Sequence, residues 1–192
     1  LNRLDAQIQT ISRYSQHLFD RKNNSQVAIG TLSTQEFGIR VSFTTNFRKV
    51  ETCCEGITSS GTLDLVKGIK CAVLALHQCK NSNGSESEID IEQDSKVPYT
   101  NEFRGKKRIL AFVGSQNNLD SKNYRDLIDI LLKEQVGIDL IELGESVPNS
   151  EVLAEFISEL NKREKPDSLL STYLPIPKSK TLLSDDVISK LE

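Results

Sequence analysis

The chain has 192 residues, the size of one domain, and this length is enough to bury roughly 70% of the surface of the unfolded chain. Its 24 basic and 27 acidic side chains and its pI of about 5.6 give no reason to expect nucleic acid as the main ligand. No apolar run approaches the ~18 residues of a membrane span, and no signal segment begins the chain. We therefore expect a soluble protein of the cytoplasm and nucleus.

The first 80 residues predict one helix, then a hairpin and then two further helices. Apolar residues recur at three- and four-residue spacing from Leu4 to Leu18, which predicts a helix. Segments 26–33 and 39–43 flank a turn and predict a β-hairpin whose second, half-polar strand lies at a sheet edge. Further helices are predicted from a cap at 44–46 through Ile57, and from Leu65 to near Cys79.

Residues 81–105 form an acidic insertion without periodicity, and we expect it to be poorly ordered. A solvated loop is the simpler interpretation. Ser85 and Ser87 lie among acids, so phosphorylation there would add charge and favour a basic partner. Asn83 begins a glycosylation acceptor pattern, which we discount because the chain has the features of an intracellular protein.

The second half of the chain alternates strands and helices. Residues 109–113 are apolar, follow three cations and end at Gly114-Ser115, which predicts a strand buried on both faces. Next come a helix that starts at Asp120 or Ser121 and stops at Gly137, and a strand at 138–143. The last predicted elements are a helix that starts at 148–150, a strand at 168–174 that is ended by Pro175 and Pro177, and a helix at 181–191. This alternation implies right-handed crossovers and a mainly parallel sheet covered on both sides.

Several segments together resemble a known family. RILAFVGS at 108–115, VGIDLIELGE at 136–145 and EVLAEFISELN at 151–161 are similar to the von Willebrand factor A-type domain of the ubiquitin-receptor subunit of the 26S proteasome regulatory particle, the non-ATPase regulatory subunit 4 family. Three upstream segments resemble it in the same order, namely 2–7, 23–32 and 68–76. The resemblance implies that residues 1–192 form one three-layer, Rossmann-like α/β domain, with a mainly parallel central sheet, helices on both faces and one antiparallel edge strand.

The resemblance also implies a first, central strand that precedes Asn2 and lies between the strands at 26–33 and 107–114. The sequence does not contain this strand. Neighbouring strands pair their backbones at about 4.8 Å, so without it two rows of buried backbone groups would have no partner. We therefore expect the complete molecule to contain it.

No metal or other cofactor is expected. Many domains of this type bind a divalent cation through an Asp-x-Ser-x-Ser run after the first strand, a Thr in a second loop and an Asp in a third. The run is absent here, Lys67 stands at the position of the Thr, and Gly114 stands at the position of the Asp. A hard cation needs clustered oxygen ligands, and a lysine ammonium repels it.

Other chemistry-bearing residues have structural explanations. The crevice past residue 113 holds Gly114, Ser115 and Gln116, without an acid, a histidine or a cysteine, and it lacks a phosphate-loop pattern. His17 and His77 have no second metal ligand at a useful spacing. The cysteines form no C-x-x-C pair, so we expect reduced, partly buried thiols at Cys53, Cys54, Cys71 and Cys79.

The resemblance therefore implies a non-enzymatic docking domain that supports recognition of ubiquitinated proteins for degradation. Its partners would be other regulatory-particle subunits, and ubiquitin would be bound by motifs beyond Glu192. No catalytic or metal-binding residue is assigned, the partner-binding residues stay unassigned, and neither nucleic acid nor a membrane is expected. Two alternatives stay open: the related scaffold domain of a transcription and DNA-repair complex, and a small α/β enzyme that binds phosphate or nucleotide.

Overall fold

The structure is a computed structural model that describes residues 2–21, 25–82, 106–144, 147–164 and 170–177. These residues form five helices and five strands in the order α1 (Arg3–Arg21), β1 (Val27–Thr31), β2 (Gly38–Thr44), α2 (Phe47–Glu55), α3 (Leu65–Ser82), β3 (Lys107–Val113), α4 (Asn123–Glu134), β4 (Val136–Leu143), α5 (Val147–Arg163) and β5 (Thr172–Ile176). No described helix is long and apolar enough to cross a membrane.

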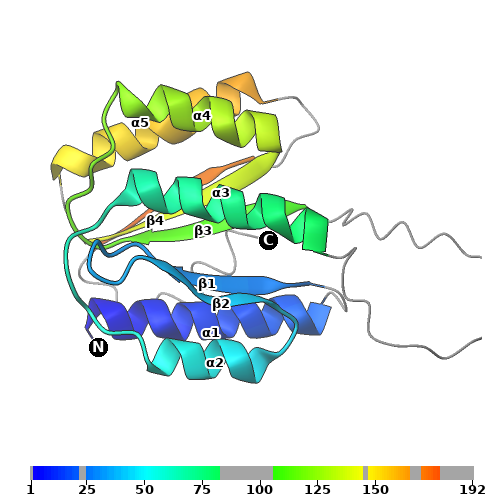
Figure 1. The fold of residues 1–192 in the computed structure, drawn as a ribbon. Coiled ribbons are helices and arrows are strands. Elements are labelled where there is room, and N and C mark those ends of the chain that lie inside the picture. The colour runs from blue at the N-terminus through cyan, green and yellow to red at the C-terminus, as the bar shows by residue number, and fades with distance from the viewer. Residues whose placement is uncertain (1, 22–24, 83–105, 145–146, 165–169, 178–192) are drawn as a thin grey trace, which may run out of the picture.

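The strands form two sheets that lie side by side between two layers of helices (Figure 1). Strands β3, β4 and β5 are parallel and adjacent in that order, with Ile109 opposite Ile138 and Ile141 opposite Leu174. Strands β1 and β2 form an antiparallel hairpin. The predicted α/β class and the antiparallel edge strand are confirmed.

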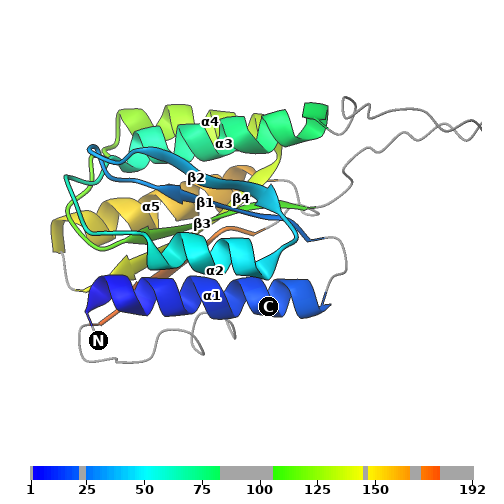
Figure 2. The ribbon, with the colours of Figure 1, turned by 60° about the horizontal axis from the view of Figure 1, so that its bottom comes forward.

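Each helix layer has its own apolar core. Helices α3, α4 and α5 cover one face of the parallel sheet, where Leu127, Phe156 and Leu160 are fully buried. On the opposite face, Ala6 of α1 packs against the cluster around Ile141. Helices α1 and α2 lie together beneath the hairpin (Figure 2), and Val50 and Ile29 belong to the core between them. The domain is therefore a helix–sheet–helix sandwich.

Local signals explain most helix starts. The Asn46 side chain accepts a hydrogen bond from the Arg48 amide at 3.0 Å and caps α2 as predicted. Asp120 Oδ1 accepts from the Lys122 and Asn123 amides at 2.9 and 2.8 Å, so the predicted residue satisfies the first amides of α4. The carboxylate of Asp64 does the same for α3, where it accepts from the Lys67 amide at 3.0 Å.

The prediction that Gly137 stops α4 is wrong. The helix ends at Glu134, and Gln135 takes the left-handed conformation (φ 55°) that closes it. Gly137 instead lies inside β4, opposite Arg108 of β3. A polar residue can take the left-handed conformation in place of glycine at a modest cost. Because Gln135 takes it, the helix closes before Gly137, and β4 starts two residues earlier than expected.

Strand β5 also departs from its prediction. It begins at Thr172 and runs through Pro175, which was expected to end it. In the described sheet β5 pairs with β4 alone, so a proline that lacks an N–H is tolerated on its outer side.

Burial in β3 is one-sided, although the sequence predicts a strand buried on both faces. Ile109, Ala111 and Val113 are buried, whereas Arg108, Leu110 and Phe112 are only half-buried. The buried side faces α3, and the half-buried side faces the layer of α1.

Helix α3 continues to Ser82, so the first two residues of the predicted acidic insertion are helical. The rest of the insertion, with Asn83, Ser85 and Ser87, lies outside the described residues, as does the predicted helix at 181–191.

Candidate functional site

A large cavity of the described domain lies between the two sheets, and we call it the intersheet slot. Its volume is about 1520 Å³. Strands β1, β2 and β3 and helices α1 and α3 contribute to its walls. The apolar side chains at its centre are Ile8 and Ile11 of α1, Val27 and Ile29 of β1, Ile69, Ala72 and Leu76 of α3, and Ile109 and Ala111 of β3.

The slot exceeds any ordinary packing defect. Native interiors contain few voids larger than a water molecule, and an engineered apolar cavity of about 150 Å³ is already large. In the described residues β1 pairs only with β2, and β3 pairs only with β4. The other backbone edge of each strand therefore has no strand beside it along the slot. The two strands do not pair with each other.

Both strands run in the same direction along the slot. Near their starts, the Cys79 thiol donates to Gln26 Oε1 at 3.5 Å, and Lys107 lies close enough to affect the pKa of Cys79. Near their ends, the Val66 amide at the start of α3 donates to Asn118 Oδ1 at 3.3 Å, and Ser33 forms a β-bridge with Leu63. Figure 1 shows β1 and β3 parallel, with α1 running the opposite way.

The charge along the slot is of one sign. Five basic residues line it, and none of the described lining residues is acidic. Four of them lie toward the starts of β1 and β3, namely Arg21, Lys106, Lys107 and Arg108. The fifth, Arg3, lies at the opposite end of the slot.

The crevice beyond β3 and β4 holds a second, smaller cavity of about 200 Å³. Arg3 occupies part of its wall, where the guanidinium Nη1 donates to the carbonyl oxygen of Gly114 at 2.5 Å. Gly144 stands opposite with φ 96°, and a side chain there would approach the Arg3 guanidinium. Ser115 and Gln116 are exposed at the rim.

Glu142 is the buried acid of this crevice, and sequence reasoning missed it. Its Oε2 accepts from Ser150 Oγ at 2.9 Å and from the Tyr173 hydroxyl. Burial, and then the hydrogen bond to Glu142, raise the pKa of Tyr173 to about 12. The Tyr173 phenol therefore stays protonated and acts as a fixed donor. The only signal in the sequence was an acid within the apolar segment 138–143.

A second buried acid, Asp139, forms an internal ion pair with Arg108. Arg108 Nη1 lies 2.6 Å from Asp139 Oδ2, and Arg108 Nη2 donates to the Leu170 carbonyl at 2.6 Å. Burial raises the pKa of Asp139, while the Arg108 charge lowers it. The pair links β3 to β4 and to the segment before β5, so its role is structural.

The two positions compared with cation ligands do not fit a hard cation. Lys67 Nζ lies 4.3 Å from the centroid of the Phe37 ring, and the Arg3 guanidinium lies on the Gly114 carbonyl. Two cationic groups therefore stand where oxygen ligands would be required. The described residues contain no cluster of histidine, cysteine and acidic side chains suited to a metal.

The remaining predicted candidates are dispersed. His77 Nδ1 pairs with Glu134 Oε2 at 2.9 Å on the surface, whereas half-buried His17 lines the slot. Burial raises the pKa of Cys53, and it raises the pKa of Cys54 to about 11, so neither thiol is an activated nucleophile. The four cysteines are free thiols.

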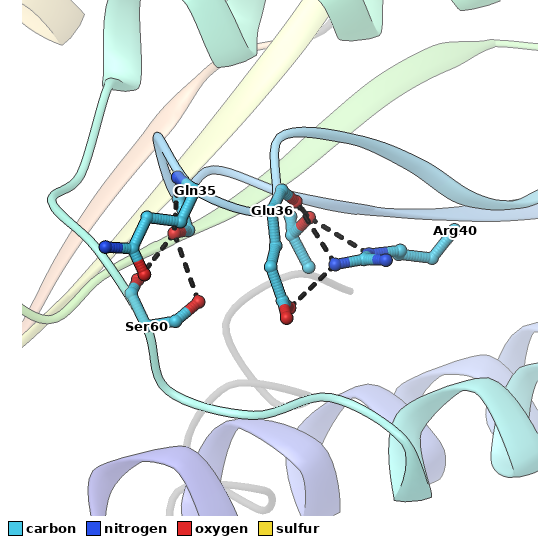
Figure 3. Close-up of polar contacts among 6 residues, drawn as sticks. Gln35, Glu36, Arg40 and Ser60 are labelled. Atoms are coloured by element: carbon cyan, nitrogen blue, oxygen red, sulfur yellow. Dashed lines mark hydrogen bonds and ion pairs between the residues drawn. The ribbon is translucent and has the colours of Figure 1, made fainter.

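The loops beyond β1 are held by hydroxyl groups. The Ser33 hydroxyl donates to the Ser60 carbonyl, and the Gln35 amide donates to Ser33 Oγ at 3.3 Å (Figure 3). On the same hairpin, Arg40 Nη2 lies 2.7 Å from Glu36 Oε2. The contact between Ser33 and Ser60 joins the segment after β1 to the segment before α3.

Comparison with known proteins gives a consistent result. No family model matches the chain. The regulatory subunit RPN10 of the 26S proteasome of Saccharomyces cerevisiae is 28% identical over 191 residues, which cover 97% of this chain and 61% of that protein. The 26S proteasome non-ATPase regulatory subunit 4 of Schistosoma mansoni is 27% identical over 174 residues, or 90% of this chain and 36% of that protein. The chain thus spans roughly a third to three fifths of the length of these relatives.

The fold comparison agrees. The crystal structure of the SpRpn10 VWA domain matches 96% of this chain and 82% of that chain, with a TM-score of 0.73 and 24% identity. The resemblance inferred from the sequence is therefore confirmed: the chain has the fold of the Rpn10 von Willebrand factor A domain and is similar, over most of its length, to proteasome regulatory subunits of the Rpn10 and non-ATPase subunit 4 type.

Proposed function

We propose that this domain is a non-enzymatic docking module of a proteasome regulatory-particle subunit that supports recognition of ubiquitinated proteins for degradation. One observation carries the proposal: 90% and 97% of the chain align with relatives named as 26S proteasome regulatory subunits. The domain would contact other regulatory-particle subunits, and the protein would act in the cytoplasm and nucleus.

The arrangement of the crevice supports a role without catalysis. A hydrolase or transferase needs a nucleophile or base whose pKa suits its task and that reaches the substrate. Here the Glu142 carboxylate is buried and accepts two hydrogen bonds, and the Tyr173 phenol stays protonated. The Arg3 guanidinium is held on the backbone of Gly114. These groups stabilise the sheet edge, which suits a rigid module.

Docking and ubiquitin binding would reside in different parts of the protein. Relatives of this kind are longer than the aligned region, which makes up 36% and 61% of the two compared here. We assign attachment to the particle to this domain, and ubiquitin binding to other segments of the whole protein. The two activities can therefore be separated by deletion.

The test is affinity purification of the tagged full-length protein from its own cells, with regulatory-particle subunits quantified by mass spectrometry. Deletion of this domain should abolish their co-purification, whereas the deleted protein should still capture ubiquitin chains. The matched control removes a segment of similar length outside the domain. Unchanged co-purification after deletion of the domain would refute the docking role, and stable recovery of transcription and repair subunits instead would favour the alternative scaffold.

An enzyme of nucleotide or phosphate type makes a different prediction. A ligand that binds only the folded state raises the thermal midpoint of unfolding. We expect no shift with nucleotides or inorganic phosphate. A shift that disappears on substitution of Arg3, which lines the smaller cavity, would contradict the non-enzymatic proposal.

A further inference from the structure

We propose that the smaller cavity, at the ends of β3 and β4, binds a neutral primary carboxamide, the side chain of an asparagine or glutamine that a partner protein presents. The inference rests on the proposed docking function and adds the chemical group that the partner supplies. The border of the cavity includes one buried acid, one guanidinium and three small residues, namely Glu142, Arg3, Gly114, Ser115 and Gly144.

The size of the cavity limits what it can hold. Its volume is about 200 Å³, whereas pockets for small-molecule ligands usually measure about 300–1,000 Å³. A nucleotide is too large for this volume, but one polar side chain fits. The cavity therefore suits a single group that projects from another polypeptide.

Glu142 offers one acceptor that the domain does not use. The residue is 3% exposed. Its Oε2 accepts from Ser150 Oγ and from the Tyr173 hydroxyl, whereas its Oε1 has no hydrogen-bond partner in the part of the chain that the structure describes. Buried polar atoms are almost always hydrogen-bonded in native proteins. Because two hydroxyl groups fix the carboxylate, Oε1 is preorganised to accept an N–H from a ligand.

Arg3 supplies the complementary donors. A guanidinium carries five N–H groups, and its contact with the described residues is one hydrogen bond, from Nη1 to the Gly114 carbonyl oxygen at 2.5 Å. The group lies close to Gly144, where an added Cβ would meet Nη2 at 3.1 Å. The Gly144 amide donates to the Ile176 carbonyl at 2.9 Å, which fixes the backbone there. The remaining N–H groups can therefore donate to a carbonyl oxygen in the cavity.

The charge balance of the cavity selects a neutral ligand. Its described lining residues carry one negative charge, on Glu142, and one positive charge, on Arg3. A carboxylate or phosphate would lie beside Glu142, and an ammonium group or metal ion would lie beside Arg3, so either would meet a like charge. A primary carboxamide is neutral and has two N–H donors and a carbonyl acceptor. A main-chain peptide group has one N–H and chain on both sides, so a side-chain carboxamide fits the small volume better.

The first experiment measures the binding of three small probes of similar size to the purified full-length protein by saturation-transfer NMR. The probes are propionamide, propionate and propylammonium. Propionamide should bind at least about tenfold more tightly than either charged probe, because each charged probe places a like charge beside Glu142 or Arg3. No binding of propionamide, or tighter binding of a charged probe, would overturn the proposal.

Two variants should reverse the preference among the probes. Glu142→Gln leaves Arg3 without its counter-charge, so propionate should become the tightest probe. Arg3→Met leaves the carboxylate alone, so propylammonium should become the tightest probe. Each variant should also weaken propionamide by about tenfold or more, because one hydrogen bond to a charged group is lost.

Matched controls lie on the other face of the helix layer. Glu151→Gln on α5 and Arg125→Met on α4 remove exposed charges of the same kind and should keep the original preference. Arg3 is exposed, so Arg3→Met keeps the test decisive if the buried substitution Glu142→Gln prevents folding. An unchanged preference in Arg3→Met would overturn the proposal.

Affinity purification of the same full-length variants tests the partner. Arg3→Met and Glu142→Gln should lower the recovery of regulatory-particle subunits by about tenfold, and the two control variants should not. Normal recovery in both cavity variants, with recovery abolished by deletion of the domain, would overturn this inference and leave the docking function intact. Failure of the docking function itself would give a different result, namely unchanged recovery after deletion of the whole domain.

Discussion

Arg108 and Asp139 provide a sharp test of how the parallel sheet is stabilised. Their side chains join β3 to β4 with Nη1 and Oδ2 2.6 Å apart, and the side chains are 23% and 1% exposed. Arg108→Met keeps an apolar stem of similar length but leaves the carboxylate without its counter-charge. Breaking one partner of a buried pair typically costs about 3–5 kcal/mol, because an uncompensated charge stays in the interior.

The pH dependence has a defined sign. Burial raises the pKa of Asp139 in the folded state above its usual value of 3.8, and Arg108 opposes this rise. An acid with a raised folded pKa binds its proton more tightly in the folded state, so its penalty is present above that pKa and disappears as the pH falls through it. Without Arg108 the pKa rises further. The deficit of Arg108→Met should therefore shrink as the pH is lowered from neutral toward 3.8.

The assay is urea denaturation at several pH values, with Arg108→Met compared against the double variant Arg108→Met/Asp139→Leu. Replacing a whole buried pair by apolar residues is often nearly neutral, so the double variant should be more stable than the single variant at neutral pH. A loss below about 1 kcal/mol for Arg108→Met would show that the pair behaves as a surface pair. A double variant as unstable as the single one would show that lost packing, and not charge, explains the loss.

Three further predictions concern packing, backbone and thiol chemistry. Phe156→Ala should lower the free energy of unfolding by about 3–5 kcal/mol, measured by urea denaturation, because the ring is fully buried; a loss under about 1 kcal/mol would contradict its place in the core. Gly144→Ala should cost about 1–3 kcal/mol because φ is 96°, whereas Gly56→Ala, at φ −86°, should cost less, and equal thermal midpoints would refute the assigned backbone. Cys54, whose pKa is raised to about 11, should react with a disulfide reagent at pH 8 more slowly than Cys53, and a faster reaction would show that Cys54 is not buried.

Local signals were sufficient for most elements. Periodicity predicted α1 and α3, the cap at Asn46 predicted the start of α2, and the alternation of strands and helices after residue 107 predicted a parallel sheet. These features depend on residues close together in the chain, so the sequence carries them directly. The family resemblance rests on the same segments, because their order and spacing repeat those of the relatives.

The errors arose where tertiary contacts override local preference. Gly137 has the residue type of a helix stop, yet it pairs with Arg108 inside the sheet, and Gln135 takes the left-handed turn instead. Pro175 has the residue type of a strand terminator, yet the outer side of β5 does not pair within the described sheet. Both outcomes depend on which strand lies beside the residue, and no local pattern carries that information.

The sequence by itself determined the fold class and most of the helix and strand segments, because these depend on residue type and short spacing. Only the tertiary structure decided that Arg108 pairs with Asp139, that Glu142 accepts a hydrogen bond from the Tyr173 hydroxyl, and that a slot lies between β1 and β3. Such contacts join residues about 30 positions apart or more, and their partners are chosen by the packing of whole elements against one another.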